Sequence, residues 1–252
     1  MTSMTHAVSR LRTQRLARCT KPFVARGSRA PRCAGCRVIA SYCLCAWRPR
    51  VAAESAVCLL MHDVEPLKPS NTGWLIADIL DDTQAFSWSR IEVDPALLAL
   101  LDDPQWQPYI VFPGEFVEST RVTETVAPNV GKRPLFILLD ATWTEARKMF
   151  RKSPYLDRFP VLSLSVEQLS RYTLRRSKRD DHFCTAEVAA LCLELAGDHQ
   201  AAQALDAWLD VFSAHYLGAK YQLPIDVDDS LHQRLRAFQA PFGEAQSAPL
   251  QA

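Results

Sequence analysis

Four cysteines within thirteen residues form the pattern with the clearest chemistry in this 252-residue chain. They are arranged as Cys33-x2-Cys36-x6-Cys43-x-Cys45, which supplies two closely spaced pairs of thiols. Two such pairs can complete a tetrahedron of sulfur around one ion, the arrangement that zinc prefers in structural sites. An iron–sulfur cluster is the main alternative, and unrelated free thiols are the other. We expect structural zinc, since four protein ligands leave no open position for catalysis.

An aspartate follows the apolar segment Leu135–Leu139. A buried strand here would place the Asp140 carboxylate at its carboxyl end, beside Thr142 and Trp143. A carboxylate in a partly apolar cleft can accept a proton when burial raises its pKa toward neutrality. The alternative is structural: Asp140 or Thr142 caps the following helix and Trp143 packs into the core. Taken alone, these residues favour the structural alternative.

Two further polar loops follow apolar segments. Phe112-Pro-Gly-Glu115 is typical of a tight turn, and its backbone could also form a shelf for a flat ligand. In the other loop, four polar residues recur every three positions: His62, Glu65, Lys68 and Asn71. Because Pro66 and Pro69 disfavour an ordinary helix, we expect an irregular polar loop there.

The elements that must position these loops alternate along the chain. Apolar runs indicate strands near 56–61, 84–91, 109–112, 135–139 and 161–164. Helical patterns cover 71–80, 95–101, 143–152, 184–196, 199–217 and 229–238. Such alternation predicts an α/β fold: a mostly parallel sheet with helices on both faces. Ligands bind these sheets at the carboxyl ends of the strands, where all three polar loops are expected to lie.

Charge is distributed unevenly, although the net charge is only +1. Residues 1–50 contain eleven Lys and Arg and no acidic residue, whereas 51–252 carry 18 basic and 28 acidic residues. A second basic segment, 147–179, has ten Lys and Arg against only Asp157 and Glu167. Two separated basic segments on an acidic body indicate surfaces for a polyanion such as RNA. The alternative is a solvated tail and a charged helix face.

The chain is expected to have four regions. They are a basic flexible arm (1–31), a zinc knuckle (32–50), a catalytic domain (51–218) and a C-terminal helix with a frayed tail (219–252). The arm could instead be a mitochondrial targeting segment, because it is rich in Arg and free of acidic residues. Clustered cysteines without a secretory signal indicate a reducing compartment, and we predict the cytoplasm. We expect no membrane association, since no segment has the apolar length of a transmembrane helix.

The segments above, taken in order, resemble the DTW-domain family of tRNA-uridine aminocarboxypropyltransferases. The resemblance rests on Cys33–Cys45, LMHDVEPLKPSNTG (60–73), VFPGE (111–115), LLDATW (138–143), ARKMFRKSPY (146–155), SRY (170–172) and CTAEV (184–188). Each segment is weak evidence alone. Their order and number, over roughly 32–195, make the resemblance specific.

The resemblance implies a SPOUT-like (knotted) core and the use of S-adenosyl-L-methionine (SAM). It implies transfer of the 3-amino-3-carboxypropyl group to N3 of a uridine in the variable loop of tRNA, with release of methylthioadenosine. SAM contains no phosphate, which agrees with the absence of a Gly-rich phosphate-binding loop. One alternative is a SPOUT-type RNA methyltransferase, which would present the methyl carbon instead. Another is a non-catalytic zinc-ribbon RNA-binding protein.

The resemblance also suggests roles for individual residues. Three residues are predicted to be catalytic: Asp140, as the base, Thr142 and Trp143. Trp143 and Tyr172 are the candidates to stack on the uridine. The residues predicted to bind SAM are Pro113, Gly114, Glu115, Thr142, Cys184, Thr185 and Glu187. Those predicted to contact tRNA are His62, Lys68, Arg147, Lys148, Arg151, Lys152, Arg171, Tyr172, Arg175 and Arg176.

Overall fold

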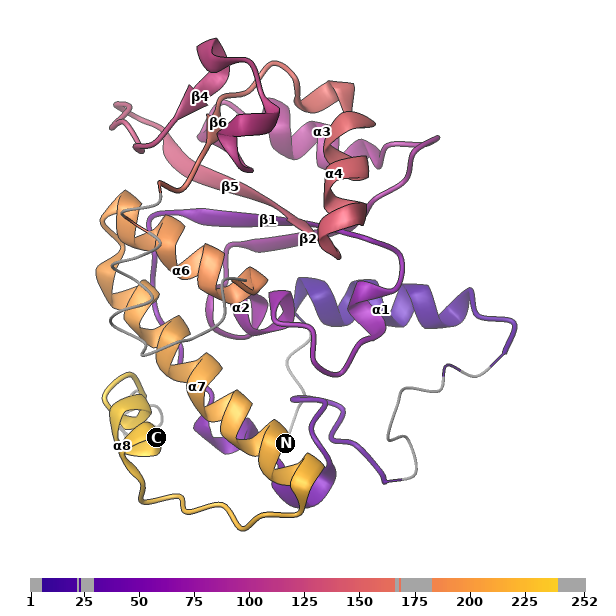
Figure 1. The fold of residues 1–252 in the computed structure, drawn as a ribbon, viewed down its shortest axis with the longest axis vertical. Coiled ribbons are helices and arrows are strands. Elements are labelled where there is room, and N and C mark those ends of the chain that lie inside the picture. Colours follow the sequence, from indigo (N-terminus) through magenta and orange to yellow (C-terminus); the bar gives the residue numbers. More distant parts are fainter. Residues whose placement is uncertain (1–5, 22, 24–29, 166–167, 169–182, 240–252) are drawn as a thin grey trace, which may run out of the picture.

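The computed structural model describes residues 6–21, 23, 30–165, 168 and 183–239. Within them lies a six-stranded sheet in which every pairing is parallel (Figure 1). Its strands, in the spatial order β2-β1-β5-β3-β6-β4, are β1 (Ala56–Met61), β2 (Thr83–Ser87), β3 (Trp106–Val111), β4 (Val122–Thr123), β5 (Arg133–Asp140) and β6 (Val161–Leu162). The predicted α/β class with a parallel sheet is therefore confirmed.

Strand β1 is apolar along its whole length because helices cover both sides of the sheet. All six residues of β1 are buried, and alternate residues point to opposite faces. Val57 and Leu59 contribute to the core on one face, whereas Cys58 and Leu60 contribute to the core on the other. This double burial explains why the strand is a continuous apolar run rather than an alternating one.

The helices divide between these two faces (Figure 1). One face is covered by α1 (Ala7–Ala17), α2 (Gly73–Ile79), α6 (Thr185–Ala196) and α7 (His199–Tyr221). The other is covered by α3 (Pro95–Asp102) and α4 (Trp143–Arg151). Helix α8 (Ser230–Arg236) packs on α7 away from the sheet. Helices on both faces were predicted, and the structure confirms them.

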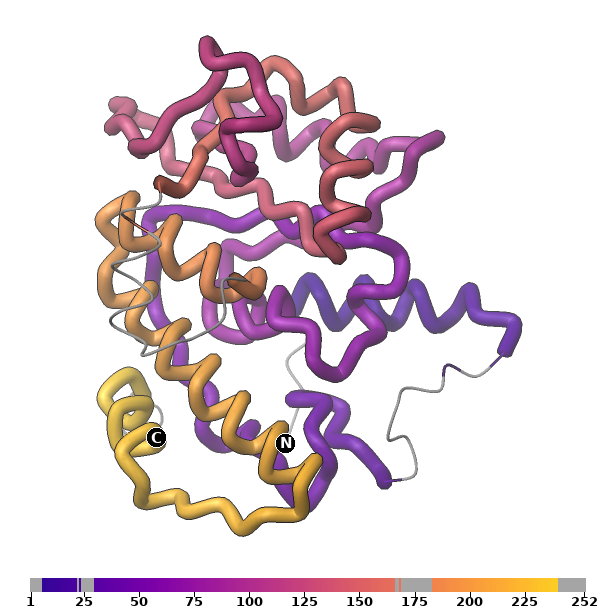
Figure 2. The backbone as a smooth tube through the Cα atoms, in the orientation of Figure 1, coloured from indigo at the N-terminus to yellow at the C-terminus, as the bar shows by residue number. Residues whose placement is uncertain are grey.

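Short 3-10 turns form much of the remaining chain. They are η1 (Ala40–Tyr42), η2 (Cys45–Trp47), η3 (Glu65–Leu67), η4 (Gly114–Phe116), η5 (Ser119–Arg121) and η6 (Pro154–Leu156). Turns η1 and η2 belong to the cysteine segment, which lies beside α7 and α8 (Figure 2). Turn η3 follows β1 and η4 follows β3, so both lie in the polar loops that the sequence indicated.

The N-terminal segment differs from the expected flexible arm. Helix α1 packs against β2 and η3, with Val8 fully buried and Leu11 only 7% exposed. Arg15 adds an ion pair to Asp63, with 2.6 Å between the nitrogen and the oxygen. The helix carries no sustained apolar stripe, so its stability comes from these tertiary contacts rather than from a pattern readable in the sequence.

Two further predictions can be compared with the structure only in part. The SPOUT-like knot stays a prediction, because 169–182 lie outside the described residues. Across the part of the chain that the structure describes, none of the helices combines the length and the apolar character required to cross a membrane.

Candidate active site and metal site

Asp140 is the last residue of β5 and lies at the carboxyl edge of the sheet. Its neighbour in the register is Met61, the last residue of β1, so the loops after both strands begin side by side. The amide of His62 donates to the Asp140 carbonyl at 3.0 Å. The side chain of Asp140 is buried, with the residue only 3% exposed. A carboxylate is thus held inside the protein where parallel sheets bind ligands.

Two side-chain donors hold this carboxylate. Asn71 Nδ2 donates to Asp140 Oδ2 at 2.8 Å, and Thr185 Oγ1 donates to Asp140 Oδ1 at 2.6 Å. Asn71 lies before α2 and Thr185 is the first residue of α6. The amide of Ala186 also donates to Thr72 Oγ1, which joins the starts of the two helices. Three segments distant in sequence therefore fix one carboxyl group.

A second buried carboxylate shares the same donor. Asn71 Nδ2 lies 3.2 Å from Glu65 Oε2, and the other oxygen of Glu65 pairs with Lys68 Nζ. Glu65 and Asn71 are each 6% exposed. The carboxyl groups of Glu65 and Asp140 are thus bridged by one amide group, with Lys68 as the cation beside them.

Burial raises the pKa of Asp140 to about 6. The hydrogen bonds from Thr185 and Asn71 act in the opposite direction, because they stabilise the ionised form. The negative charge of Glu65 raises the pKa further, and the positive charge of Lys68 lowers it. The result is a carboxylate that is mostly ionised at neutral pH yet able to take up a proton, as a general base requires.

Glycine is required at the start of α2. A Cβ at Gly73 would lie 2.6 Å from Asp140 Oδ2 and 3.2 Å from its Cγ, closer than side-chain atoms normally approach. The backbone of α2 can therefore lie directly against the carboxylate only because residue 73 has no side chain.

Thr142 caps helix α4 in the structure. Its hydroxyl and its amide both donate to Glu145 Oε2, at 2.6 Å and 3.1 Å, as in a capping box. Glu145 Oε1 also lies 3.5 Å from His62 Nδ1. Thr142 and His62 therefore meet through Glu145, at the N-terminus of α4 and next to Asp140.

Trp143 does not pack into the core. It is 51% exposed and stacks on Phe112, with 5.6 Å between the ring centroids. Phe112 stacks in turn on Phe150, and the edge of Phe116 meets Trp143. Arg147 lies over the Phe116 ring at 4.6 Å. These residues form an open aromatic surface that joins the loop after β3 to α4, which begins three residues after Asp140.

The other predicted SAM-binding residues fall into two groups. Pro113, Gly114 and Glu115 lie in the loop after β3, where the Gly114 amide donates to Ser163 Oγ at 3.0 Å. Cys184, Thr185 and Glu187 lie at the start of α6. Among these six, Thr185 hydrogen-bonds to Asp140, whereas Glu187 is buried and accepts from the Cys184 amide.

The predicted tRNA-binding residues also divide. Arg147, Lys148, Arg151 and Lys152 lie on or just after α4 and are all exposed. His62 and Lys68 lie in the loop after β1, and Lys68 is engaged by Glu65. Four residues lie outside the described part of the chain: Arg171, Tyr172, Arg175 and Arg176.

The four predicted metal ligands come together. The sulfur atoms of Cys33, Cys36, Cys43 and Cys45 all lie within 4.8 Å of one another. Individual separations are 3.6 Å for Cys33–Cys45, 3.8 Å for Cys36–Cys43 and 3.5 Å for Cys33–Cys43. Metal–sulfur bonds of about 2.3 Å in a tetrahedron require sulfur atoms about 3.8 Å apart, so the set fits one ion. A Cβ at Gly35 would lie 2.8 Å from Cys45 Sγ, which explains the glycine in this turn.

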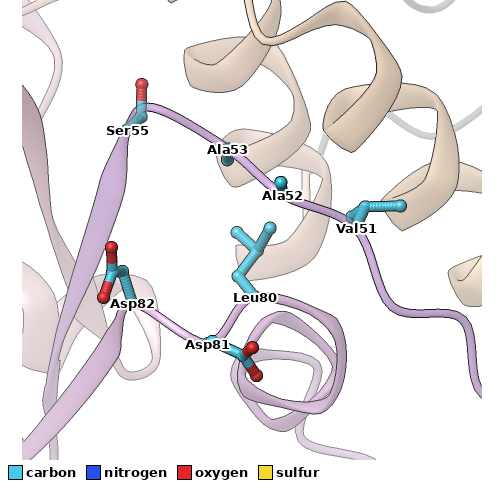
Figure 3. Close-up of a pocket in the computed structure, with 7 residues that line it drawn as sticks. All are labelled: Val51, Ala52, Ala53, Ser55, Leu80, Asp81 and Asp82. Atoms are coloured by element: carbon cyan, nitrogen blue, oxygen red, sulfur yellow. The ribbon is translucent and has the colours of Figure 1, made fainter. Parts of the chain in front are cut away.

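A pocket at the opposite edge of the sheet lies away from this chemistry. It has a volume of about 190 Å³ and is lined by residues preceding β1 and β2, among them Ser55, Leu80 and Asp82 (Figure 3). Because Asp140 lies at the carboxyl ends of the strands, this pocket does not belong to the candidate active site.

Sequence reasoning assigned no site role to Asn71, Glu65 or Gly73. The three-residue spacing brought Glu65 and Asn71 to notice, yet it indicated only a polar loop. Asn71 lies 69 residues before Asp140, and no local pattern shows that a loop amide will meet a strand-end carboxylate. The LKPSNTG segment, which contains Asn71 and Gly73, could have indicated these residues only through the family resemblance.

Comparisons with known proteins identify the family of this chain. The family model described as "DTW domain" matches residues 30–217, which include the cysteine set, the loop after β1, Asp140 and α6. A relative named tRNA-uridine aminocarboxypropyltransferase 2, from Drosophila melanogaster, is 25% identical over 176 residues. The match covers 66% of this chain and 66% of the relative's length. No solved structure matches the chain significantly. Since the family model spans well over half of the chain, the protein belongs to the DTW domain family.

Proposed function

We propose that this protein is a transferase that modifies uridine in tRNA with the 3-amino-3-carboxypropyl group of SAM. The observation that carries the proposal is the buried carboxylate of Asp140 at the carboxyl edge of the sheet, held by Asn71 and Thr185. Membership of the DTW domain family and the name of the Drosophila relative support this reaction. We further propose N3 of a uridine in the variable loop as the acceptor.

Asp140 would accept the proton from N3 of the uridine. A pKa of about 6 leaves the carboxylate mostly ionised at neutral pH, and its two donors keep it in one orientation. When bound, SAM supplies a sulfonium whose γ-carbon is electrophilic. The deprotonated N3 would form the new bond to that carbon as the carbon–sulfur bond breaks. The electron pair of the broken bond would remain on sulfur in the departing methylthioadenosine, and Asp140 would pass its proton to solvent.

The two buried carboxylates at Asp140 and Glu65 suit a cationic ligand. Glu65 and Asp140 are two buried carboxylates with Lys68 as the neighbouring cation, so the cluster carries a net negative charge when both are ionised. We propose that the loop after β3 (Pro113, Gly114, Glu115) and the start of α6 (Cys184, Thr185, Glu187) bind SAM. Thr142 and Glu187 would contribute by capping α4 and α6.

The aromatic surface at the start of α4 suits an unstacked base. Trp143 offers an exposed ring above Phe112, and bases stack on such rings in single-stranded RNA. The cations of α4, which are Arg147, Lys148, Arg151 and Lys152, would contact phosphates of the tRNA. Binding should then weaken steeply with added salt. His62 at the rim and the basic residues of 171–176 are proposed to extend this surface.

We also propose that the metal is zinc with a structural role. Four sulfur ligands at tetrahedral spacing suit Zn²⁺, and a closed set of four leaves no position for substrate. The reaction is expected in the cytoplasm.

The test is incubation of purified protein with unmodified tRNA and SAM, followed by mass spectrometry of the nucleosides and the small products. We expect a uridine heavier by one aminocarboxypropyl group, together with methylthioadenosine. A methylated nucleoside with S-adenosylhomocysteine would replace the proposal with an RNA methyltransferase. The absence of any new nucleoside would favour the zinc-ribbon RNA-binding protein.

The substitution Asp140→Asn separates catalysis from binding. It removes the proton acceptor but keeps the size of the side chain. We expect modification to fall at least a hundredfold while tRNA affinity stays within about twofold, since general-base catalysis contributes on the order of 10²–10⁴. Full modification by this variant would exclude Asp140 as the base.

A further inference from the structure

We propose that Arg37 is a positioning residue through which the cysteine knuckle (residues 32–50) holds the Asp140 site in its working geometry. Arg37 follows the metal ligand Cys36 directly, yet its side chain points away from the metal site into the domain. There it contacts the loop that carries Asn71. The inference rests on the proposed function only for the effect of Arg37 on the reaction, because the contacts of Arg37 do not depend on that function.

One guanidinium nitrogen of Arg37 lies within hydrogen-bonding distance of three carbonyl oxygens of the loop. Nη1 lies 3.0 Å from the carbonyl oxygen of Asn71, 3.2 Å from that of Pro69 and 3.4 Å from that of Lys68. Arg37 is only 4% exposed. A buried, charged donor shared by carbonyls of one loop fixes the path of that loop, because a hydrogen bond from a charged group is stronger than one between neutral groups.

The guanidinium is itself held rigidly. It lies over the Trp74 ring at 4.3 Å and faces the Phe212 ring at 5.6 Å. Both rings are buried, with Trp74 2% and Phe212 4% exposed. The flat guanidinium therefore lies between aromatic rings of α2 and α7, which restrict its movement.

The backbone of the knuckle directs this side chain. Arg37 has φ +65°, in the left-handed region that residues other than glycine seldom adopt. The amide of Arg37 donates to the Cys33 carbonyl at 2.9 Å, so this conformation closes the turn that presents Cys33 and Cys36 to one ion. The conformation that forms the metal site is therefore also the one that sends Arg37 into the domain.

Asn71 connects Arg37 to the carboxylate. Its carbonyl accepts from Arg37, while its side chain donates to Asp140 and to Glu65. A shift of the Asn71 backbone would therefore move the amide that bridges the two carboxyl groups. The path from metal ligand to proposed base runs through Cys36, Arg37, Asn71 and Asp140.

The charge balance also connects the knuckle to this part of the domain. Three guanidinium groups, those of Arg12, Arg37 and Arg48, act on the buried carboxylate of Asp78 or on one another. His6 also faces Asp78, but burial lowers its pKa to about 3 and it stays neutral. The guanidinium groups outnumber the one buried carboxylate, so this cluster carries a net positive charge. Four thiolates with one Zn²⁺ would carry a net negative charge, so metal binding would offset part of it.

The primary test uses hydrogen exchange and needs no catalysis. Exchange of the backbone amides of 62–72 is measured in the full-length, zinc-loaded protein and its variants. We expect Arg37→Met to accelerate exchange in this loop at least tenfold, with the zinc content unchanged and β5 still protected. Arg37→Lys, which keeps a cationic donor, should restore part of the protection. Removing zinc from the wild-type protein with a chelator should accelerate the same amides.

Arg48→Met is the matched control. Arg48 is another largely buried arginine of the knuckle, but it pairs with Asp78 at 2.9 Å rather than with the loop. We expect its loss to lower overall stability without a selective effect on 62–72. The proposal is overturned if Arg37→Met leaves exchange of the loop unchanged, or if Arg48→Met accelerates it as much.

Kinetics provide the second readout. In Arg37→Met we expect kcat to fall at least tenfold with little change in KM for tRNA. The acid limb of the pH profile should move to higher pH, because a weakened Asn71 bond stabilises the ionised Asp140 less. An unchanged limb would contradict the positioning role. A wild-type protein that modifies no tRNA would refute the proposed function, whereas the exchange experiment would still decide the role of Arg37.

Discussion

Gly73→Ala would place a methyl group against the carboxylate of Asp140. The new Cβ would lie 2.6 Å from Oδ2, whereas ordinary contacts begin at 3.4 Å, so the oxygen must withdraw by about 0.8 Å. It cannot do so freely, because Asn71 and Thr185 hold the two carboxyl oxygens at 2.8 Å and 2.6 Å. Withdrawal would stretch the bond to Asn71 beyond hydrogen-bonding distance.

The cost follows from that bond. A hydrogen bond to a charged group contributes about 1.5–3 kcal/mol, and replacing glycine by alanine in a helix returns at most about 1 kcal/mol. We therefore expect Gly73→Ala to lower the free energy of unfolding by about 1–2 kcal/mol. If the same bond holds Asp140 for proton transfer, kcat/KM should fall roughly 10- to 100-fold.

Gly218→Ala is the matched control. Its Cβ would also meet an atom at 2.6 Å, but that atom is Cδ1 of Ile225, the end of a flexible apolar side chain. Gly218 lies in α7, where alanine favours the helix. We expect its stability to stay within about 1 kcal/mol of wild type and its activity to be unchanged. Urea unfolding and tRNA-modification rates measure both variants. A wild-type rate in Gly73→Ala, or equal losses in the two variants, would refute the reasoning.

Three further predictions test other parts of the structure. Activity should rise with pH through a value near 6 as Asp140 ionises. Glu65→Gln should move this acid limb to lower pH, because the Glu65 charge raises the pKa of Asp140. Thr185→Val should move it to higher pH, because the Thr185 hydrogen bond lowers that pKa. Values of kcat/KM measured between pH 5 and 8 test both variants, and a shift of the acid limb in the same direction in both would contradict the prediction. Trp143→Ala should raise KM for tRNA about 5- to 150-fold, because stacking of a base contributes about 1–3 kcal/mol. The urea midpoint should stay near wild type, because the ring is 51% exposed. Leu11→Ala should cost about 2–5 kcal/mol in urea unfolding, because Leu11 is buried in the core; a mobile arm would show no loss.

Much of the fold is predictable from the sequence because its central strands are continuous apolar runs. The run from Ala56 to Met61 is a strand whose residues are all buried, and the run within 133–140 is its neighbour in the sheet. The later helices are long and periodic, and Gly197 ends α6 with a left-handed φ of +90°. These features depend on local composition and on burial that composition implies.

The contacts of the candidate site are not predictable in this way. Thr185 lies 45 residues after Asp140 in the chain, and the distance to Asn71 is larger still. Whether these side chains meet depends on the strand register and on how α2 and α6 start against each other. Helix α1 illustrates the same limit, since it is fixed by a few buried residues rather than by a periodic stripe.

The tetrapeptide Asp140–Trp143 shows how tertiary structure assigns roles that a motif leaves open. From the sequence, either Asp140 or Thr142 could cap the following helix, and Trp143 could belong to the core. In the structure Thr142 and Glu145 form the cap, so the Asp140 carboxylate is not needed for it. Asp140 lies two residues after Leu138, on the same face of β5 as the core beneath α2 and α6. The carboxylate therefore turns toward Asn71 and Thr185, where burial raises its pKa, while Trp143 stays at the surface. Because the cap is formed without it, the carboxylate of Asp140 is available for the role of base that we propose.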